Sequence, residues 1–262
     1  MNFRFSDPRL RDLPLGSSEW FRAQRSLVLS KPLIKRCYDL WYSLLLSDAD
    51  SVHVGARAAA TVELGSGSSY VKSIRPSVIT SDVIAGLVDL VLDGRALPFA
   101  DESVRAIFLA HVFHHIPDAE AFFREALRVL VPGGVVSMIE ISHTPFARFF
   151  FSHLHPEPYN DRTEQWQFPE GHSMLDSNQA LSWVVLFRDR ARFAGLFPAM
   201  CLERFEYLPW LSYLLSGGVN VRSFVPRLLV PAVAAADEVL KPLDPLFALH
   251  WHLTVRKAAL KT

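Results

Sequence analysis

Short apolar runs alternate with helix-like spacing through the middle of the chain, and this alternation predicts a parallel sheet covered by helices. The pattern places strands near 60–64, 77–81, 87–92, 105–110 and 134–141, with helices near 66–73 and 118–130. The crossover around 83–86 looks too short for a helix. Helical spacing returns over 178–197, and residues 200–208 and 247–257 have the pattern of two more strands. Together these runs predict a seven-stranded, mostly parallel α/β sheet.

The N-terminal region has a different pattern. Residues 1–17 contain two prolines and mixed charge, which favours an irregular arm, whereas residues 18–46 have helical spacing that Pro32 divides into two helices. These helices either cover the core or form a lid over a substrate. We expect an N-terminal helical cap over 1–50, a core over 51–145, and a substrate loop, last helix, final strands and helical insert over 146–262.

Two later stretches depart from the alternation. After Ile141 comes a long segment rich in histidine, proline and aromatic residues, and long loops in compact α/β domains are often functional. The other is an apolar insert within 208–245, which Pro226, Pro231 and further prolines divide into short helices. The insert either packs as a helical lid or contacts a lipid surface, in which case the side chains at the boundary would be Trp210, Tyr213, Arg222, Phe224 and Arg227.

Composition narrows the class of protein. A length of 262 residues favours one core with attached helical segments, and a formal net charge of zero argues against a nucleic-acid partner. Two cysteines provide neither a disulfide framework nor a metal-binding CxxC pair. Neither a secretory signal nor an apolar run of spanning length is visible, so we expect a cytoplasmic protein with possible contact at the inner face of a membrane.

A glycine loop follows the first predicted strand of the core, in the sequence TVELGSGSSYVK. Gly65, Ser66 and Gly67 leave backbone N–H groups accessible at the strand end, which suits a nucleotide-sized ligand. The dinucleotide pattern G-x-G-x-x-G requires a third glycine where this chain has Tyr70. Glu63, two residues before the loop, would repel phosphates, so the loop favours a cationic or zwitterionic ligand.

Three acidic residues are predicted at strand ends: Glu63, Asp82 and Asp93. Each by itself is equally consistent with a solvated strand end or a helix cap. Asp82 has the spacing of a carboxylate that accepts hydrogen bonds from a ribose diol, and Asp93 lies one strand farther, in reach of an adenine amine. As a set they predict an adenosine site beside the glycine loop.

The segments ELGSGSS, SD, LDGRALPFADESVRAIFLAHVFHHI and FFREALRVLVPGGVVSMIE carry a family resemblance over residues 58–142. They resemble the class I S-adenosylmethionine-dependent methyltransferases, and within them the bacterial type 11-like group. A weaker likeness from HPEPYND to YLLSGG is similar to versions found beside sugar-transfer and envelope-assembly enzymes. The resemblance implies a Rossmann-like fold, S-adenosyl-L-methionine as cofactor, and methyl transfer as the reaction.

The resemblance also implies roles for individual residues. Glu63 and the backbone from Gly65 through Ser66 to Gly67 would hold the methionine portion of the cofactor. Asp82 would bind the ribose, Asp93 with Gly94 the adenine, and His111 would line the pocket. Many relatives have glycine where this chain has Ser69, which leaves the approach of the loop to the carboxypropyl arm open.

Histidines are concentrated near the predicted acceptor end. If the acceptor is a hydroxyl, a base must remove its proton, and histidine suits this role near neutral pH. We expect His115 or His155 to be that base, with His114, Glu157 and Tyr159 binding the acceptor; the alternative is that these side chains only cap helices or pack. His111 and His115 have the spacing of a helical zinc pair, but no third ligand is evident, so we expect no metal.

The sequence therefore favours O-methylation of a small or glycan- or lipid-linked acceptor by in-line transfer. Oxygen is favoured because the Asn-Pro-Pro-Tyr motif typical of nitrogen methylation is absent. Two alternatives stay open: an NAD(P)-dependent oxidoreductase, and a non-catalytic methyltransferase-like partner protein. Fold and cofactor do not specify the acceptor, and the sequence does not reveal the oligomeric state.

Overall fold

A computed structural model describes residues 7–53, 59–169 and 176–259. Its centre is a seven-stranded sheet with strand order β3-β2-β1-β4-β5-β7-β6. Strands β1 to β5 are parallel to one another, and β7 is antiparallel to both β5 and β6. The strands are β1 Ala60–Leu64, β2 Ile79–Asp82, β3 Leu90–Val91, β4 Val104–Ala110, β5 Leu130–Ile141, β6 Met200–Tyr207 and β7 His250–Lys257. This arrangement confirms the expected mostly parallel α/β sheet.

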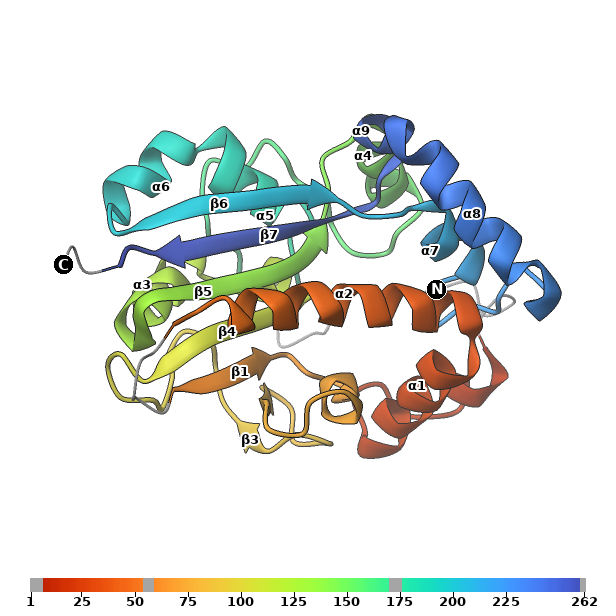
Figure 1. The fold of residues 1–262 in the computed structure, drawn as a ribbon, viewed down its shortest axis with the longest axis horizontal. Helices are drawn as coiled ribbons and strands as arrows, with labels where there is room; N and C mark the ends of the chain where they lie inside the picture. Colours follow the sequence, from red (N-terminus) through yellow and green to blue (C-terminus); the bar gives the residue numbers. More distant parts are fainter. Residues whose placement is uncertain (1–6, 54–58, 170–175, 260–262) are drawn as a thin grey trace.

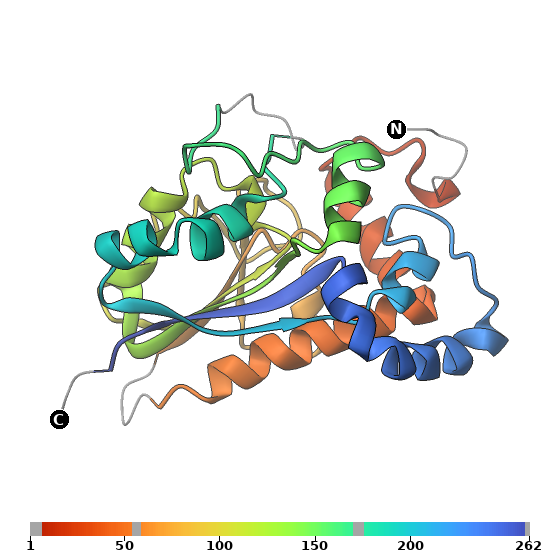
Figure 2. The ribbon, with the colours of Figure 1, turned by 90° about the horizontal axis from the view of Figure 1, so that it is seen from above.

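Helices cover both faces of the sheet. Helix α2 (Pro32–Asp50) crosses one face, while α3 (Ala119–Val129) and α6 (Arg190–Leu196) lie on the other (Figures 1 and 2). Side chains alternate along β4, so that Phe108 joins the core under α2 whereas Ile107 joins the core under α3. Because each face is buried by its own helical layer, the central strands are apolar on both sides.

The division of the N-terminal helices at Pro32 is confirmed. Helix α1 (Ser18–Ser30) starts at Ser17, whose hydroxyl accepts a hydrogen bond from the backbone N–H of Trp20 at 3.1 Å. Pro32 occupies the first turn of α2, where its missing N–H removes no helical hydrogen bond. Before α1, the predicted irregular arm contains one 3₁₀ turn, η1 (Pro8–Leu10); residues 1–6 of the arm lie outside the described residues.

Two segments that were predicted as α-helices have a different local structure. Residues 66–73 form only a 3₁₀ turn, η2 (Tyr70–Ser73), because Gly65, Gly67 and Ser69 adopt positive φ values of 61°, 48° and 50°. The segment 178–197 is broken into α5 (Leu181–Trp183), a π-helical turn η4 (Val184–Arg188) and α6. A π-turn inserts an extra residue per turn, which 3.6-residue spacing in the sequence does not reveal.

Three boundaries also differ from expectation. Strand β3 contains only two residues, and the segment after Ile141 contains a helix, α4 (Pro145–His153), that was not predicted. Helix α3 ends at Val129 and β5 begins at Leu130, so the Pro-Gly-Gly turn at 132–134 lies inside a strand that was expected to begin near 134. At Gly134 a Cβ atom would lie 2.9 Å from the carbonyl oxygen of Val131, which makes glycine necessary for this bulged path.

The C-terminal insert forms a helical wall at the carboxyl ends of the strands (Figure 1). It contains α7 (Leu211–Ser216), η5 (Arg227–Leu229), α8 (Val230–Leu240), η6 (Lys241–Leu243) and α9 (Asp244–Phe247). As predicted, prolines divide it: Pro231, Pro242 and Pro245 each lie in the first turn of an element. Within the described residues, the helices are too short or too polar to cross a bilayer.

A buried polar network attaches α2 to the sheet. Asp48, 3% exposed, accepts hydrogen bonds on Oδ2 from Ser137 Oγ at 2.6 Å, from Thr254 Oγ1 at 2.7 Å and from His252 Nε2 at 2.9 Å. Burial by itself would raise the pKa of Asp48, but these hydrogen bonds outweigh it and the pKa is lowered. Because its donors lie on β5 and β7, this one carboxylate connects the helix to two strands.

Candidate active site

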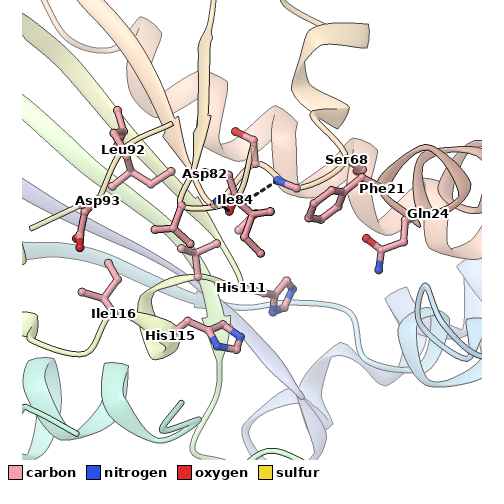
Figure 3. Close-up of a pocket in the computed structure, with 18 of the residues that line it drawn as sticks. Phe21, Gln24, Ser68, Asp82, Ile84, Leu92, Asp93, His111, His115 and Ile116 are labelled. Carbon is pink, nitrogen blue, oxygen red and sulfur yellow. Dashed lines mark hydrogen bonds between the residues drawn. The ribbon is translucent and has the colours of Figure 1, made fainter. Parts of the chain in front are cut away.

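A cavity of about 600 Å³ opens at the carboxyl ends of β1, β2 and β4. The order β3-β2-β1-β4 places the reversal of winding between β1 and β4, which is where ligands bind in open α/β sheets. Figure 3 shows Asp82 near the centre of this cavity, with Asp93 on one side and Phe21 on the other. Its remaining wall includes side chains from α1 and α2, so the N-terminal helices cover the cavity as well as the core.

The glycine loop forms the floor of the cavity and requires its glycines. A Cβ atom on Gly65 would lie 2.5 Å from Val112 Cγ2, and one on Gly67 would lie 3.2 Å from Phe21 Cε1. Both residues also have positive φ, a conformation that L side chains rarely adopt. The loop therefore keeps its backbone open to the cavity, as the sequence predicted for Gly65, Ser66 and Gly67, all of which line it.

Asp82 ends β2 and holds the glycine loop. Its Oδ2 accepts a hydrogen bond from the backbone N–H of Gly67 at 3.0 Å, and its Oδ1 accepts one from that of Ile84 at 3.1 Å. Burial raises the pKa of this carboxyl, although the backbone hydrogen bonds oppose the shift. Each carboxylate oxygen has more than one acceptor site, so both can accept a further hydrogen bond from a ligand in the cavity.

Asp93 and Gly94 follow β3 and line the same cavity. The Asp93 carboxylate accepts hydrogen bonds from the backbone N–H of Arg95 at 2.8 Å and from its guanidinium, with Nη2 at 2.6 Å. These hydrogen bonds lower the pKa of Asp93. A Cβ atom on Gly94 would lie 3.1 Å from Leu64 Cδ1, so a side chain there would crowd the end of β1.

Glu63 lies beneath the loop, not in the wall of the cavity. It is 1% exposed and is absent from the described residues that line the space; its Oε1 accepts a 2.5 Å hydrogen bond from the Tyr42 hydroxyl. Burial raises the pKa of Glu63 to about 7, opposed by that hydrogen bond. Glu63 Oε2 is buried and has no hydrogen-bond partner among the described residues, and a cationic ligand above the loop would stabilise this acceptor.

His111 lines the cavity at the end of β4, as predicted. Its φ is 60°, an uncommon value outside glycine, and its ring packs against Trp41 and His250 at centroid distances of 4.9 and 4.6 Å. Burial lowers the pKa of His111 to about 4, so the ring is neutral at pH 7. Its Nε2 is a second buried atom beside the cavity for which the described part of the chain provides no hydrogen-bond partner.

His114, His115 and Glu157 form a cluster at the acceptor end. His114, in the 3₁₀ turn η3 (Phe113–His115), donates from Nδ1 to Glu140 Oε2 at 2.6 Å, and its Nε2 lies 3.6 Å from Glu157 Oε2. His115 Nε2 lies at the same distance from that oxygen, while His115 Nδ1 donates to the Asp176 carbonyl at 3.1 Å. Of these residues, His115 lines the cavity (Figure 3).

The charges in this cluster are strongly coupled. Burial by itself would lower the pKa of His114, but Glu140 and Glu157 outweigh it and raise the pKa to about 10. Burial and the neighbouring His114 lower the pKa of His115 to about 4. Burial by itself would raise the pKa of Glu157, but the nearby His114 imidazolium lowers it to about 2. At neutral pH, His115 therefore has a free lone pair on Nε2.

Two other residues that were predicted to act at the acceptor end, His155 and Tyr159, are not among the described residues that line the cavity. His155 Nδ1 accepts a 3.4 Å hydrogen bond from the backbone N–H of Glu157, and its ring packs against Phe151. The Tyr159 hydroxyl lies 2.8 Å from His143 Nδ1. The structure thus brings His114, His115 and Glu157 together. His155 instead contacts the backbone of Glu157, and the Tyr159 hydroxyl contacts His143.

Sequence reasoning missed two residues that organise the site. Glu140 Oε1 accepts hydrogen bonds from the backbone N–H groups of Val112 and Phe113 at 3.0 and 2.7 Å, which fixes the turn that carries the histidines. Glu140 could have been identified in the same way as Glu63 and Asp82, because it too is an acidic residue near the end of an apolar strand. Tyr42, on the buried face of α2, had no comparable signal.

Comparisons with known proteins agree with this geometry. Residues 65–138 match the family model of a methyltransferase domain. Demethylmenaquinone methyltransferase of Renibacterium salmoninarum is 36% identical over 78 residues, which cover 30% of this chain and 29% of that protein. The uncharacterised protein YafS of Escherichia coli K12 is 28% identical over 166 residues, or 61% of this chain and 59% of that protein. The chain thus matches under two thirds of the length of either relative.

Solved structures of similar topology have low sequence identity. Geranyl diphosphate C-methyltransferase of Streptomyces coelicolor has a TM-score of 0.46 and 13% identity, covering 97% of this chain and 89% of that one. An S-adenosylmethionine-dependent methyltransferase of Mesorhizobium loti has a TM-score of 0.43 with 12% identity, covering 80% of this chain and 96% of that one. The matched segment, 65–138, contains the glycine loop, Asp82 and His115, so this part of the chain is similar to a methyltransferase domain.

Proposed function

We propose that this protein transfers a methyl group from S-adenosylmethionine to an oxygen atom of a small or glycan- or lipid-linked acceptor. The observation that carries the proposal is Asp82, which ends β2, binds the glycine loop through Gly67 and faces a cavity of about 600 Å³. When bound, the cofactor supplies an electrophilic methyl group on a sulfonium centre. The protein must hold this group in line with the acceptor and exclude water.

The residues of the cavity fit such a cofactor. Asp82 has acceptor sites left for two ribose hydroxyls, and Asp93 with Gly94 lies one strand farther, where the adenine would bind. Glu63 and the backbone of Gly65–Gly67 suit the cationic methionine portion, because Glu63 Oε2 is a buried acceptor that no described residue hydrogen-bonds. Phe21, from α1, lies over the loop and limits access of water.

The alternatives make different demands on the same residues. A nicotinamide oxidoreductase would need a third glycine for the pyrophosphate, but that position is Tyr70, which is 1% exposed and donates a hydrogen bond to Asp39 at 2.7 Å. A non-catalytic partner protein would not need a cofactor site. Calorimetry with S-adenosylmethionine and S-adenosylhomocysteine separates these possibilities, and the absence of binding to either compound would contradict the proposal.

The acceptor is to be found by a labelled-methyl screen. Envelope sugars, lipid-linked intermediates and small phenols represent the acceptor classes that the sequence favours. Radiolabel transferred to a hydroxyl would support O-methylation, whereas label on nitrogen or carbon would replace oxygen as the accepting atom. Transfer to none of them by protein that binds the cofactor would contradict the proposed acceptor class.

We expect His115→Gln to lower the rate of methyl transfer about 100-fold or more, because a positioned general base contributes roughly 10²–10⁴-fold. His115 lines the cavity and has a free lone pair on Nε2, whereas His155 does not line it. His155→Gln is therefore the matched comparison and should have a smaller effect. Cofactor affinity should be unchanged in both, and unchanged turnover in both variants would remove these two histidines as bases.

The same proposal includes contact with a membrane surface through the C-terminal insert. Leu228 is 88% exposed and Val239 is 77% exposed, and Phe224 also lies open to solvent. Two of the side chains predicted at the lipid boundary face elsewhere: Trp210 stacks on Phe247, and Tyr213 packs against Trp41 and His250. A lipid contact would therefore involve η5 and α8, next to the basic residues Arg227 and Lys241.

Flotation with anionic liposomes tests this contact. We expect the native protein to float with the vesicles and the double variant Leu228→Ser, Val239→Ser to lose about 100-fold in partitioning, since each buried leucine or valine contributes roughly 1.5 kcal/mol or more. Leu196→Ser is the control, because Leu196 is an exposed leucine on α6, far from α8 (Figure 1). Equal flotation of all three proteins, or of none, would contradict the contact.

A further inference from the structure

The cluster of His114, His115 and Glu157 has a geometry that hydrogen bonding by itself does not explain. Both imidazole Nε2 atoms lie 3.6 Å from Glu157 Oε2, beyond hydrogen-bond distance, and the three ligand atoms all lie within 4.8 Å of one another. Ligands at about 2.1 Å from a tetrahedral metal ion are separated by roughly 3.4 Å. The three atoms therefore surround a space of the size that such an ion occupies.

The outer hydrogen bonds orient each ring toward that space. His114 donates from Nδ1 to Glu140, and His115 donates from Nδ1 to the Asp176 carbonyl, so both rings direct Nε2 to the centre of the cluster. Metal-binding histidines almost always have such a carboxylate or carbonyl acceptor behind them. The Glu157 carboxylate is in turn held by Gln179 and by the Ser177 hydroxyl.

The charges around the cluster give a second, independent reason to expect a bound cation. Glu140 is fully buried and Glu157 largely so, and together they place two negative charges beside His114. A divalent cation between the two rings would lie close to both carboxylates, and buried carboxylates are usually paired with a cation or bound to a metal.

We propose that His114, His115 and Glu157 bind one divalent transition-metal cation, such as Zn²⁺, at the acceptor end of the cavity. Two imidazole nitrogens and one carboxylate oxygen suit zinc or iron and leave coordination positions open. His115 lines the cavity, so an open position there is accessible to a ligand. The site replaces the His111 and His115 pair considered from sequence spacing, because His111 packs against Trp41 and His250 instead.

The cation site depends on the geometry of this cluster and not on methyl transfer. If the proposed function also holds, an acceptor hydroxyl bound at the open position would lose its proton more easily. In that case the lower rate expected for His115→Gln would come from loss of the cation instead of loss of a general base. The binding experiment is therefore done without S-adenosylmethionine, so that its result does not depend on the methyltransferase activity.

The test uses untagged full-length protein from which metals have been stripped with a chelator. Titration with Zn²⁺ in competition with a chromophoric chelator should show one saturable site per chain. His115→Gln and Glu157→Gln should each weaken binding at least about tenfold. His153→Gln is the matched control, because His153 is an exposed histidine whose Nδ1 donates to the Phe149 carbonyl and whose ring stacks on that of Phe149. Absence of a saturable site, or equal affinity in all variants, would overturn the proposal.

A spectroscopic measurement on the native protein covers the case in which a substituted chain fails to fold. Co²⁺ bound by two imidazoles and a carboxylate in four- or five-coordinate geometry absorbs visible light much more strongly than the hydrated ion. We expect these bands to saturate at one equivalent of Co²⁺ and to disappear when Zn²⁺ is added. A spectrum identical to that of hydrated Co²⁺ would contradict the site.

Discussion

Asp82→Asn should lower the affinity for S-adenosylhomocysteine about 100-fold. Hydrogen bonds to a charged group contribute roughly 1.5–3 kcal/mol each, and the carboxylate would accept two from the ribose. The substitution also acts on the loop, because an amide nitrogen cannot accept from the backbone N–H of Gly67 or of Ile84. Isothermal titration calorimetry measures the change, and thermal unfolding of the same samples checks that the variant is folded.

Asp89→Asn is the matched control for this experiment. Asp89 accepts a hydrogen bond from the backbone N–H of Thr80 on β2 and pairs with Lys72 at 2.5 Å, but it is not among the described residues of the cavity wall. We expect the affinity of Asp89→Asn for S-adenosylhomocysteine to stay within about twofold of the native value, since surface ion pairs contribute little. If Asp82→Asn bound S-adenosylhomocysteine with native affinity, Asp82 would not belong to the cofactor site. The observation on which the proposed function rests would then be lost.

Asp48→Ala should destabilise the protein by about 3–5 kcal/mol, the usual cost of removing one partner from a buried charged network. Three donors on β5 and β7, in Ser137, Thr254 and His252, would lose their common acceptor. Because the pKa of Asp48 is lowered in the folded state, its contribution is present above about pH 4 and is lost as the pH falls through the folded value. Urea unfolding followed by circular dichroism measures the difference.

Asp50→Ala, on the same helix, provides the comparison. Its carboxylate pairs with Arg75, with the two side chains 51% and 40% exposed, so its removal should cost less than about 1 kcal/mol. The contrast separates the effect of the buried network from that of removing an acidic residue near the end of α2. Equal destabilisation by the two substitutions would show that the network does not hold the helix on the sheet.

The order of elements and two acidic residues of the cavity wall were predictable from local pattern. Apolar alternation identified the strands, and Asp82 and Asp93 were found because each acidic residue follows an apolar run. Both line the cavity. Glu63 was found by the same signal, but its depth beneath the loop was not, because burial depends on Tyr42 packing from α2. The helix expected over 66–73 was wrong because glycine and serine at positive φ turn the backbone away from helical geometry.

The sequence by itself determined a mostly parallel sheet, a glycine loop and a set of acidic strand ends, because these depend on spacing within short segments. The tertiary structure decided which histidines meet. His114 and His115 are adjacent in the chain, but Glu140 and Glu157 reach them from β5 and from the loop after α4, 26 and 43 residues away for His114. Such contacts depend on how distant segments pack, and no local period along the chain reports that packing.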